Sequence, residues 1–352
     1  MSHPLADFYR GKRVLVTGHT GFEGGWTVAW LKLLGAQVCG YGLPPSTRPN
    51  FFDATLLDRG ITSIFADIRD RNSLATAFTD TQPEIVIHCA AQSSPQSSLQ
   101  EPVDAFSTNV MGTVHILEEA RLTQSVRAVV LVSGESDGCP EPQSGRKTGP
   151  SDGVDLRSAT RACAEQARSA FNKAFFHKTT TAVASARIGD AIGGGDWRKG
   201  RLVPDLVRAL ASGEAAHAGE GEIRIWHVLE PVHACLRLAH SVFERARQSA
   251  GVWDFGAGEQ GRIGAADFAA QFASIWNVDG NSPPENSSKP AAPVKSSARE
   301  GQSELGWSSV LSAEQALAWT VEWYRGFYAN PSSALRTTED QLERYAQIVA
   351  GR

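Results

Sequence analysis

The sequence is poor in cysteine: five stand among 352 residues, and no two of them form a CxxC pair. An odd number of widely spaced cysteines is typical neither of a disulfide framework nor of a zinc site. We therefore expect them to be small buried side chains in a reducing cytoplasm. They are Cys39, Cys89, Cys139, Cys163 and Cys235.

The sequence also lacks an excess of positive charge and any long apolar run. Its 34 basic and 38 acidic residues give a formal net charge of −4, so no basic field favours nucleic acid or an anionic membrane as a partner. No apolar run approaches the roughly 18 residues that span a bilayer. The opening stretch MSHPLADFYRGKR lacks the apolar centre of a signal peptide. These absences predict a cytoplasmic location and no nucleic-acid or membrane partner.

The first half of the chain alternates between strand-like and helix-like patterns. Short apolar runs bounded by turn residues alternate with helical stretches such as WTVAWLKLLG, a pattern typical of a parallel sheet with helices on both faces. The predicted fold class is α/β, a Rossmann-like doubly wound parallel sheet over residues 1–189. A smaller C-terminal region, 190–352, follows, and some of its strands and helices could return to the sheet. The expected strands are 13–18, 37–43, 61–67, 84–91, 128–134 and 181–189.

Three stretches of the remaining sequence have clear local patterns. Residues 158–178 have a helical pattern, and residues 277–301 are rich in proline and serine, which predicts a loop. Ser312 is the expected N-cap of a helix over LSAEQALAWTVEWYRGFY.

A glycine pattern, GHTGFEGGW, follows the first predicted strand directly. Gly18, Gly21 and Gly24 permit the tight turn and the close backbone approach that a pyrophosphate needs at a helix N-terminus. The second strand, in VCGYGLPPSTR, does not end on an acidic residue that could hold an adenosine ribose; Asp67, at the end of the third strand, could meet the adenine instead. Two alternatives stay open: the turn binds a dinucleotide, or it preserves a fold whose dinucleotide is lost.

Several longer stretches resemble the extended short-chain dehydrogenase/reductase superfamily, and within it the CDP-glucose 4,6-dehydratases. They include GKRVLVTGHTGF, PEIVIHCAAQ, TNVMGTVHILE, IGGGDW, RLVPDLVRAL and HVLEP, and they extend over nearly the whole chain. The resemblance implies a Rossmann domain and a C-terminal region that grips a nucleotide-diphosphate sugar. It also implies a homodimer formed through the helices at 109–122 and 158–176.

The resemblance assigns two sets of binding residues. The cofactor set is Gly18, Gly21, Phe22, Gly24, Asp67, Ile68, Ala90 and Asn109. The substrate set is Gln92, Asp196, Arg201, Leu202, Val203, Asp205, Arg224 and His227.

The same resemblance exposes departures at the reacting centre. Family members carry a Thr-Asp-Lys-type run where this chain has Gly134, Glu135 and Ser136, and a Tyr-x-x-x-Lys motif where it has Arg157 and Arg161. A 4,6-dehydratase needs a tyrosinate to remove a hydroxyl proton during hydride transfer to NAD. Arginine stays protonated at any relevant pH, so it cannot act as that base. We therefore expect the redox dehydratase chemistry to be lost.

Other residue types could supply a different chemistry at this centre. Arg157 and Arg161 lie four residues apart, on one helix face, and suit bidentate contact with phosphate; the alternative is a surface pair matched to nearby acids. Glu135, Asp137 and Asp190 could act as general acids or bases or hold a divalent cation, or they are solvated loop acids. These five residues, Glu135, Asp137, Arg157, Arg161 and Asp190, are the catalytic candidates.

A weaker metal-ligand pattern occurs in HVLEPVH. Its spacing could place His227, Glu230 and His233 around a metal ion. The alternative is that HVLEP, which is ordinary family sequence at a helix start, has only a structural role.

The preferred hypothesis is a non-redox isomerisation of a nucleotide-diphosphate sugar, with a GDP-hexose favoured. A sequence that keeps its nucleotide-binding segments but lacks the redox residues resembles the flavin-independent pyranose–furanose mutases of antibiotic sugar pathways. This hypothesis requires no flavin, makes NAD dispensable, and allows Mn²⁺ or Mg²⁺ to assist. Two alternatives remain: a degenerate NAD-dependent dehydratase, and a non-catalytic sensor of a nucleotide sugar or cofactor.

Overall fold

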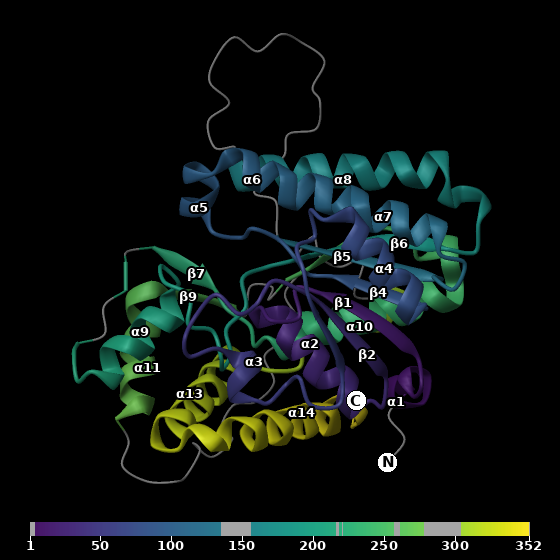
Figure 1. Cartoon of the computed structure of the whole chain (residues 1–352). Helices are drawn as coiled ribbons and strands as arrows, with labels where there is room; N and C mark the ends of the chain where they lie inside the picture. Colours follow the sequence, from purple (N-terminus) through teal and green to yellow (C-terminus); the bar gives the residue numbers. More distant parts are fainter. Residues whose placement is uncertain are drawn as a thin grey trace.

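The computed structural model describes residues 4–134, 156–215, 218–219, 221–256, 261–277 and 304–351. Its centre is a parallel sheet in the order β3-β2-β1-β4-β5-β6-β8 (Figure 1). The α/β doubly wound fold that the sequence predicts is therefore confirmed. The strands of the sheet are β1 (Arg13–Thr17), β2 (Gln37–Gly42), β3 (Thr62–Phe65), β4 (Ile85–His88), β5 (Ala128–Gly134), β6 (Ala182–Ile188) and β8 (Gly251–Phe255).

The central strands are buried on both faces, which explains their unbroken apolar sequences. In β1, Val14 and Val16 pack into the larger core cluster, and Leu15, between them, packs into the cluster on the other face. Because side chains alternate along a strand, a two-faced core needs apolar residues at every position.

Helices cover the sheet in two layers. Helices α2 and α10 contact the strands on one face, while α7 and α8 contact β4 and β6 on the other. The first half of the chain contributes α1 (Pro4–Tyr9), α2 (Phe22–Leu33), α3 (Phe51–Ala54), α4 (Arg71–Thr81), α5 (Pro95–Gln100), α6 (Pro102–Phe106), the π-helix η1 (Ser107–Met111), α7 (Gly112–Leu122), α8 (Leu156–Ala174) and the 3₁₀-helix η2 (Phe176–Lys178).

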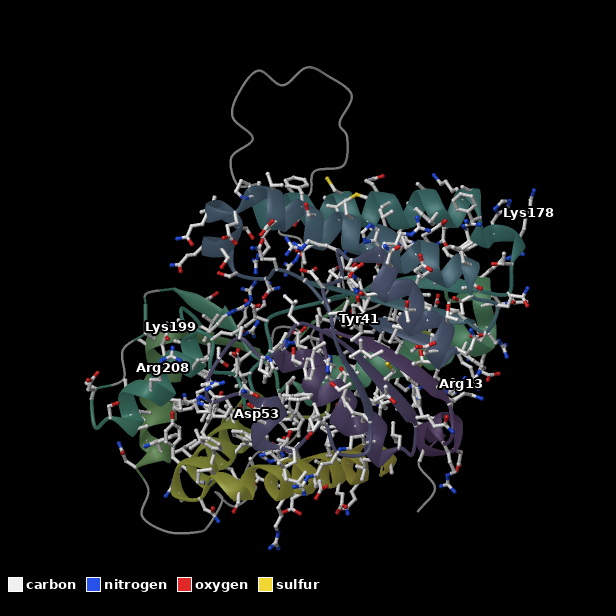
Figure 2. All side chains as sticks on the ribbon, in the orientation of Figure 1. Arg13, Tyr41, Asp53, Lys178, Lys199 and Arg208 are labelled. Carbon is white, nitrogen blue, oxygen red and sulfur yellow. The ribbon has the colours of Figure 1, made fainter. Side chains whose placement is uncertain are left out.

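The second half contributes α10 to a layer of the sheet, a small lobe, and the C-terminal helices. The lobe consists of the antiparallel strands β7 (Glu222–Arg224) and β9 (Arg262–Gly264) with α9 (Leu202–Ala211) and α11 (Ala265–Trp276) (Figure 1). Lys199 and Arg208 lie in or beside this lobe, while Lys178 lies at the opposite side of the molecule (Figure 2). The other elements are α10 (Leu229–Arg245), the 3₁₀-helix η3 (Ala246–Gln248), α13 (Ala313–Ala329), the 3₁₀-helix η5 (Pro331–Ser333) and α14 (Ala334–Ala350).

The sheet takes one strand from beyond residue 189, because β8 pairs with β6. Farther along the chain, Ser312 caps α13 as predicted: its side chain accepts a hydrogen bond from the Gln315 backbone, and the Gln315 side chain accepts one in return. None of the helices that the structure describes is long and apolar enough to span a bilayer.

The predicted helix over 109–122 is interrupted near its start. A π-helical turn, η1, precedes α7, which begins only at Gly112. Asn109 lies in this turn; its side-chain oxygen accepts from the Gln92 backbone N–H at 2.8 Å, and its nitrogen donates to the Gln92 carbonyl at 3.2 Å. The π-turn thus fixes the loop that follows β4, and such turns are frequent at functional sites.

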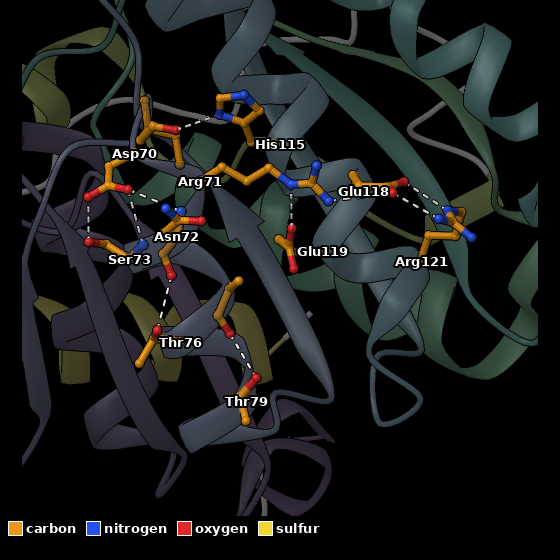
Figure 3. A network of polar contacts seen from close by, with 12 residues as sticks. Asp70, Arg71, Asn72, Ser73, Thr76, Thr79, His115, Glu118, Glu119 and Arg121 are labelled. Atoms are coloured by element: carbon orange, nitrogen blue, oxygen red, sulfur yellow. Dashed lines mark hydrogen bonds and ion pairs between the residues drawn. The ribbon is translucent and has the colours of Figure 1, made fainter.

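The loop after β3 is fixed by contacts between α4 and α7 (Figure 3). Asp70 caps the start of α4 by accepting backbone hydrogen bonds. Arg71 donates to Glu119 of α7 at 3.0 Å, and the His115 ring lies 3.1 Å from the Ile68 carbonyl oxygen. These contacts hold the segment between β3 and α4 against the carboxyl edge of the sheet.

Candidate functional site

The carboxyl ends of β1, β4, β5 and β6 surround a cavity of about 390 Å³, which we call the glycine-turn cavity. It lies where the strand order reverses, between β1 and β4, and ligands bind at such switch points in open α/β sheets. The predicted site residues that line it are Gly18, Gly21, Phe22, Gly24, Asp67, Ile68, Ala90, Asn109, Arg161, Asp190 and Arg201.

The glycine turn at the floor of this cavity has no room for side chains. Gly18 has a φ of +70°, and a Cβ there would lie 2.8 Å from the Ala90 nitrogen. A Cβ on Gly24 would overlap the Gly18 carbonyl oxygen. Helix α2 begins at Phe22, and no side chain caps it. The backbone N–H groups of its first turn are therefore available to an anion.

Asp67 and Ile68 follow β3 and line one end of the glycine-turn cavity. The Tyr41 hydroxyl donates to the Asp67 carbonyl at 3.0 Å. Arg69 forms a hydrogen-bonded ion pair with the Asp67 carboxylate at 2.7 Å, and this hydrogen bond lowers the pKa of that carboxyl. Asp67 is therefore an ionised, anchored carboxylate at this end.

At the other end, Arg161 of α8 lies over the last residue of β5. A Cβ on Gly134 would overlap the Arg161 guanidinium, so the glycine makes room for the arginine. One turn along α8, Glu165 accepts from Ser185 at 2.5 Å and from Arg168 at 2.7 Å. The predicted Glu135 and Asp137, together with Ser136, lie outside the described residues.

A second cavity of about 580 Å³ lies between α8, the segment after β6, α9 and β7. We call it the arginine cavity, because Arg157, Arg198, Arg201 and Arg224 line it. The Arg157 Nε is buried and has no hydrogen-bond partner in the described part of the chain. The predicted site residues that line this cavity are Phe22, Arg157, Asp190, Asp196, Arg201, Leu202, Val203 and Arg224.

The two cavities share a wall, formed by residues that line both: Phe22, Glu23, Gly189, Asp190, Arg198 and Arg201. Arg198 donates to both oxygens of Asp196, at 2.8 and 2.7 Å, and its guanidinium lies 5.9 Å from the centre of the Phe22 ring.

Asp190 is the predicted carboxylate in this wall, and Arg201 lies 3.0 Å from it. The side chain of Asp190 is exposed; its partial desolvation acts to raise its pKa, but Arg201, Arg157 and Arg161 outweigh this effect and lower the pKa. Asp190 is therefore an ionised partner of the arginines.

Three predicted substrate residues do not line either cavity. Gln92 is held by Asn109 through its backbone. Asp205 pairs with Arg208, one turn along α9. His227 is fully buried, with its ring 5.9 Å from that of Trp26. The structure does not bring these three side chains to the site.

The HVLEPVH segment forms part of the core. Glu230 accepts hydrogen bonds from the Val310 and Leu311 backbones at 2.8 and 2.7 Å and from the Tyr345 hydroxyl at 2.7 Å. Within the described ranges, no group of three His, Cys, Asp or Glu residues could hold a metal ion. The prediction of metal ligation by His227, Glu230 and His233 is wrong, because the carboxylate at its centre is occupied by hydrogen bonds.

We expect the Glu230→Gln variant to lose much of the pH dependence of folding stability. Burial raises the pKa of Glu230 from 4.5 to about 7, so the folded protein holds this proton more tightly than the unfolded chain. The resulting stabilisation, about 3 kcal/mol at most, is complete below pH 4.5 and is lost as the pH rises through about 7. Urea unfolding across this range measures it.

The control for this variant is Glu244→Gln, which changes an exposed residue on the same helix. It should keep the wild-type slope of unfolding free energy against pH. Equal slopes for wild type and Glu230→Gln would contradict the prediction.

A doubly wound sheet with a glycine turn at its switch point defines the class of Rossmann-type nucleotide-binding proteins. Within that class, the chain belongs to the NAD dependent epimerase/dehydratase family, whose model matches residues 14–240.

A curated relative and two solved structures resemble the chain over most of its length. CDP-glucose 4,6-dehydratase of Salmonella typhimurium is 34% identical over 334 residues, covering 91% of this chain and 92% of the relative. The structure of UDP-glucose 4-epimerase from Thermotoga maritima with UDP-glucose has a TM-score of 0.69 at 21% identity and covers 89% of this chain and 98% of its own. The Bordetella bronchiseptica enzyme WbmF with NAD⁺ and UDP has a TM-score of 0.69 at 18% identity, with coverages of 96% and 99%.

The hypothesis that makes NAD dispensable and allows a divalent metal to assist is wrong in its cofactors. The matched family is described as NAD dependent, the Bordetella enzyme holds NAD⁺, and the described part of this chain offers no metal-ligand group. The glycine pattern therefore predicted the cofactor better than the missing tyrosine and lysine did, because the geometry of the glycine turn is intact.

Two charged residues of the shared wall were not predicted. Glu23 interrupts the glycine pattern, and Arg198 follows GGGDW directly. A charged residue inside the glycine pattern is the signal that could have identified Glu23. Arg198 reaches both cavities only through the folded loop, so no local pattern marks it.

Proposed function

We propose that the protein binds NAD in the glycine-turn cavity and a nucleotide-diphosphate hexose in the arginine cavity, as a 4,6-dehydratase-like enzyme. The observation that carries this proposal is the shared wall, which would place the two ligands against one another. The relative from Salmonella typhimurium, aligned over nearly the full length of both chains, supports the choice of reaction class.

The glycine-turn cavity fits a dinucleotide. The cradle between Gly18 and Gly24 is one that a Cβ would fill, and the first turn of α2 presents uncapped N–H groups toward it. Asp67 and Ile68 would contact the adenosine end. When bound, NAD supplies a hydride acceptor, and the residues of this chain position it.

The arginine cavity fits a diphosphate and its sugar. Arg157, Arg201 and Arg224 line it, and guanidinium groups bind phosphate oxygens in bidentate pairs. The unpartnered Nε of Arg157 would gain an acceptor when a phosphate enters, which relieves the cost of burying it unpaired.

The experiment that tests this function joins native mass spectrometry to an assay with CDP-glucose and a panel of UDP- and GDP-hexoses. We expect retained NAD(H) and a 4-keto-6-deoxy product, detected by NMR. Protein that neither retains nor binds NAD(H), or that gives no keto sugar from any hexose, would overturn the dehydratase proposal. Ligand-dependent thermal stabilisation without turnover would indicate a sensor.

A second candidate is a pyranose–furanose mutase. The observation that favours it is that neither cavity is lined by tyrosine or lysine among the residues the structure describes, and arginine cannot replace tyrosinate as a base. The bond between C1 and the diphosphate would break, and the 4-hydroxyl oxygen would bond to C1 as its proton passes to a carboxylate. The diphosphate would then rebond to C1 as the C1–O5 bond opens and O5 takes up the proton. A five-membered product ring, without a keto sugar, distinguishes this reaction by NMR.

We also infer a homodimer formed through the helices at 109–122 (η1 and α7) and 158–176 (α8), as the family resemblance implies. Met111 is 47% and Leu122 53% exposed on the first of these, and exposed apolar residues often mark interfaces. Light scattering is expected to give twice the chain mass, and a monomer mass would contradict it.

A further inference from the structure

We propose that Glu23 is the acid–base residue of this site, exchanging a proton with the ligand held at the shared wall. The proposal rests on the proposed function, because it takes the two cavities as binding sites. It assigns a role to a residue that the family motifs do not single out.

Glu23 is placed where both ligands could reach it. It is the second residue of α2 and lines the glycine-turn cavity and the arginine cavity at once. In the described part of the chain, no hydrogen bond or ion pair holds its carboxylate; only its backbone carbonyl is engaged, by the Thr27 hydroxyl at 2.8 Å.

The other described carboxylates that line the cavities are already occupied. Asp67 pairs with Arg69, Asp190 with Arg201, Asp196 with Arg198, and Glu222 with Arg262, while Glu165 accepts from Ser185 and Arg168. A carboxylate held by arginine is a weak base, because the ion pair stabilises its charged form. Glu23 is therefore the described carboxyl group best able to gain and lose a proton.

The electrostatic surroundings of Glu23 support this role. Burial raises the pKa of Glu23, and Asp190 acts in the same direction, while Arg198, Arg201 and Arg161 partly oppose both. These charges come from α8 and from the segment between β6 and α9. A carboxyl with a raised pKa is better matched to proton transfer near neutral pH than an ordinary glutamate is.

In the dehydratase reaction the proton to be moved lies on a secondary hydroxyl of the sugar. A carboxylate oxygen of Glu23 takes that proton as the O–H bond breaks and the C=O bond forms. NAD, held by the glycine turn, would supply the acceptor for the hydride that leaves the same carbon. The mutase reaction moves the 4-hydroxyl proton in the same way, so the assignment does not depend on which reaction occurs.

The position of Glu23 also links proton binding to cofactor binding. A carboxylate in the first turn of α2 lies where the resemblance places a pyrophosphate, and two negative groups at close range repel one another. Protonated Glu23 avoids this repulsion. We therefore expect bound NAD⁺ to raise the pKa of Glu23 further, so that a proton is taken up on binding at pH values near that pKa and the Kd increases as the pH rises. Above that range Glu23 stays a carboxylate in the complex, and this is the form that takes the hydroxyl proton.

The test compares the wild type with Glu23→Gln, using calorimetry of NAD⁺ binding at several pH values in two buffers of different ionisation enthalpy. The wild type should take up a proton on binding, whereas the variant should take up none and should bind with a pH-independent Kd. Turnover of the nucleotide sugar should fall about 100-fold or more in the variant. Glu23→Asp should retain part of the activity with a shifted pH profile.

The matched control is Glu314→Gln, which changes an exposed residue at the second position of another helix, α13. It should behave as the wild type in every measurement. A Glu23→Gln enzyme with wild-type proton uptake and turnover would overturn the proposal. Failure of the wild type itself to bind NAD⁺ and nucleotide sugars would instead overturn the proposed function on which it rests.

Discussion

The Gly24→Ala variant is expected to bind NAD⁺ about 100-fold more weakly than the wild type, or not at all. The added methyl group would overlap the Gly18 carbonyl oxygen, and it would also lie 2.8 Å from the Gly18 carbonyl carbon and 3.2 Å from the His19 Cα. All three are backbone atoms, so the turn must open. Opening turns the N–H donors of α2 away from the pyrophosphate, and each lost charge-assisted hydrogen bond costs about 1.5–3 kcal/mol. Isothermal titration calorimetry measures the affinity.

The adjacent glycine provides the control. A methyl group on Gly25 would lie 2.7 Å from an atom of the Phe51 ring, a side chain, and would meet the turn only at the His19 carbonyl oxygen, at an ordinary contact distance of 3.6 Å. The Gly25→Ala variant should therefore lose some stability but keep its NAD⁺ affinity. If both variants bind NAD⁺ like the wild type, the glycine turn is not the pyrophosphate site.

The Arg201→Ala variant should bind CDP between about 10-fold and about 100-fold more weakly, the loss expected when one charged partner of a phosphate is removed. Arg201 lines both cavities and is the 3.0 Å partner of Asp190. Without Arg201, less positive charge offsets the Asp190 carboxylate, and this carboxylate then repels the entering diphosphate. The affinity for CDP can be titrated by calorimetry without any assay of turnover.

In α9, which Arg201 directly precedes, Arg208→Ala removes an arginine that pairs with Asp205 and lines neither cavity. Its CDP affinity should match that of the wild type. An equal loss in both variants would mean that α9, rather than the guanidinium of Arg201, controls binding.

Local sequence patterns predicted the parts of the fold that depend on local physics. The apolar run around Val14 and Val16 predicted a buried strand, and Ser312 predicted a helix start, because burial and capping depend on residues close in sequence. The π-turn around Asn109 was not predictable, since it depends on hydrogen bonds to Gln92, 17 residues away in the chain.

For the same reason, the sequence identified some cavity-lining residues and missed others. Gly18 and Gly24, which line the glycine-turn cavity, could be identified because the glycine pattern lies in one short turn. Arg157 and Arg161 were identified as departures from a family pattern, and both line cavities. Glu23 acquires its surroundings only when three separate segments meet. His227 was wrongly placed among the metal ligands. Its spacing from Glu230 is compatible with metal ligation, but its side chain is buried in the core.

The fit between Gly134 and Arg161 couples the two positions. A side chain at position 134 would displace the guanidinium of Arg161 from its present place, a movement that a long, flexible side chain can make. The residue at 134 therefore sets where the positive charge of Arg161 lies at the end of β5. A mutant library that varies positions 134 and 161 together would sample placements of this charge that a library varying one position at a time would miss.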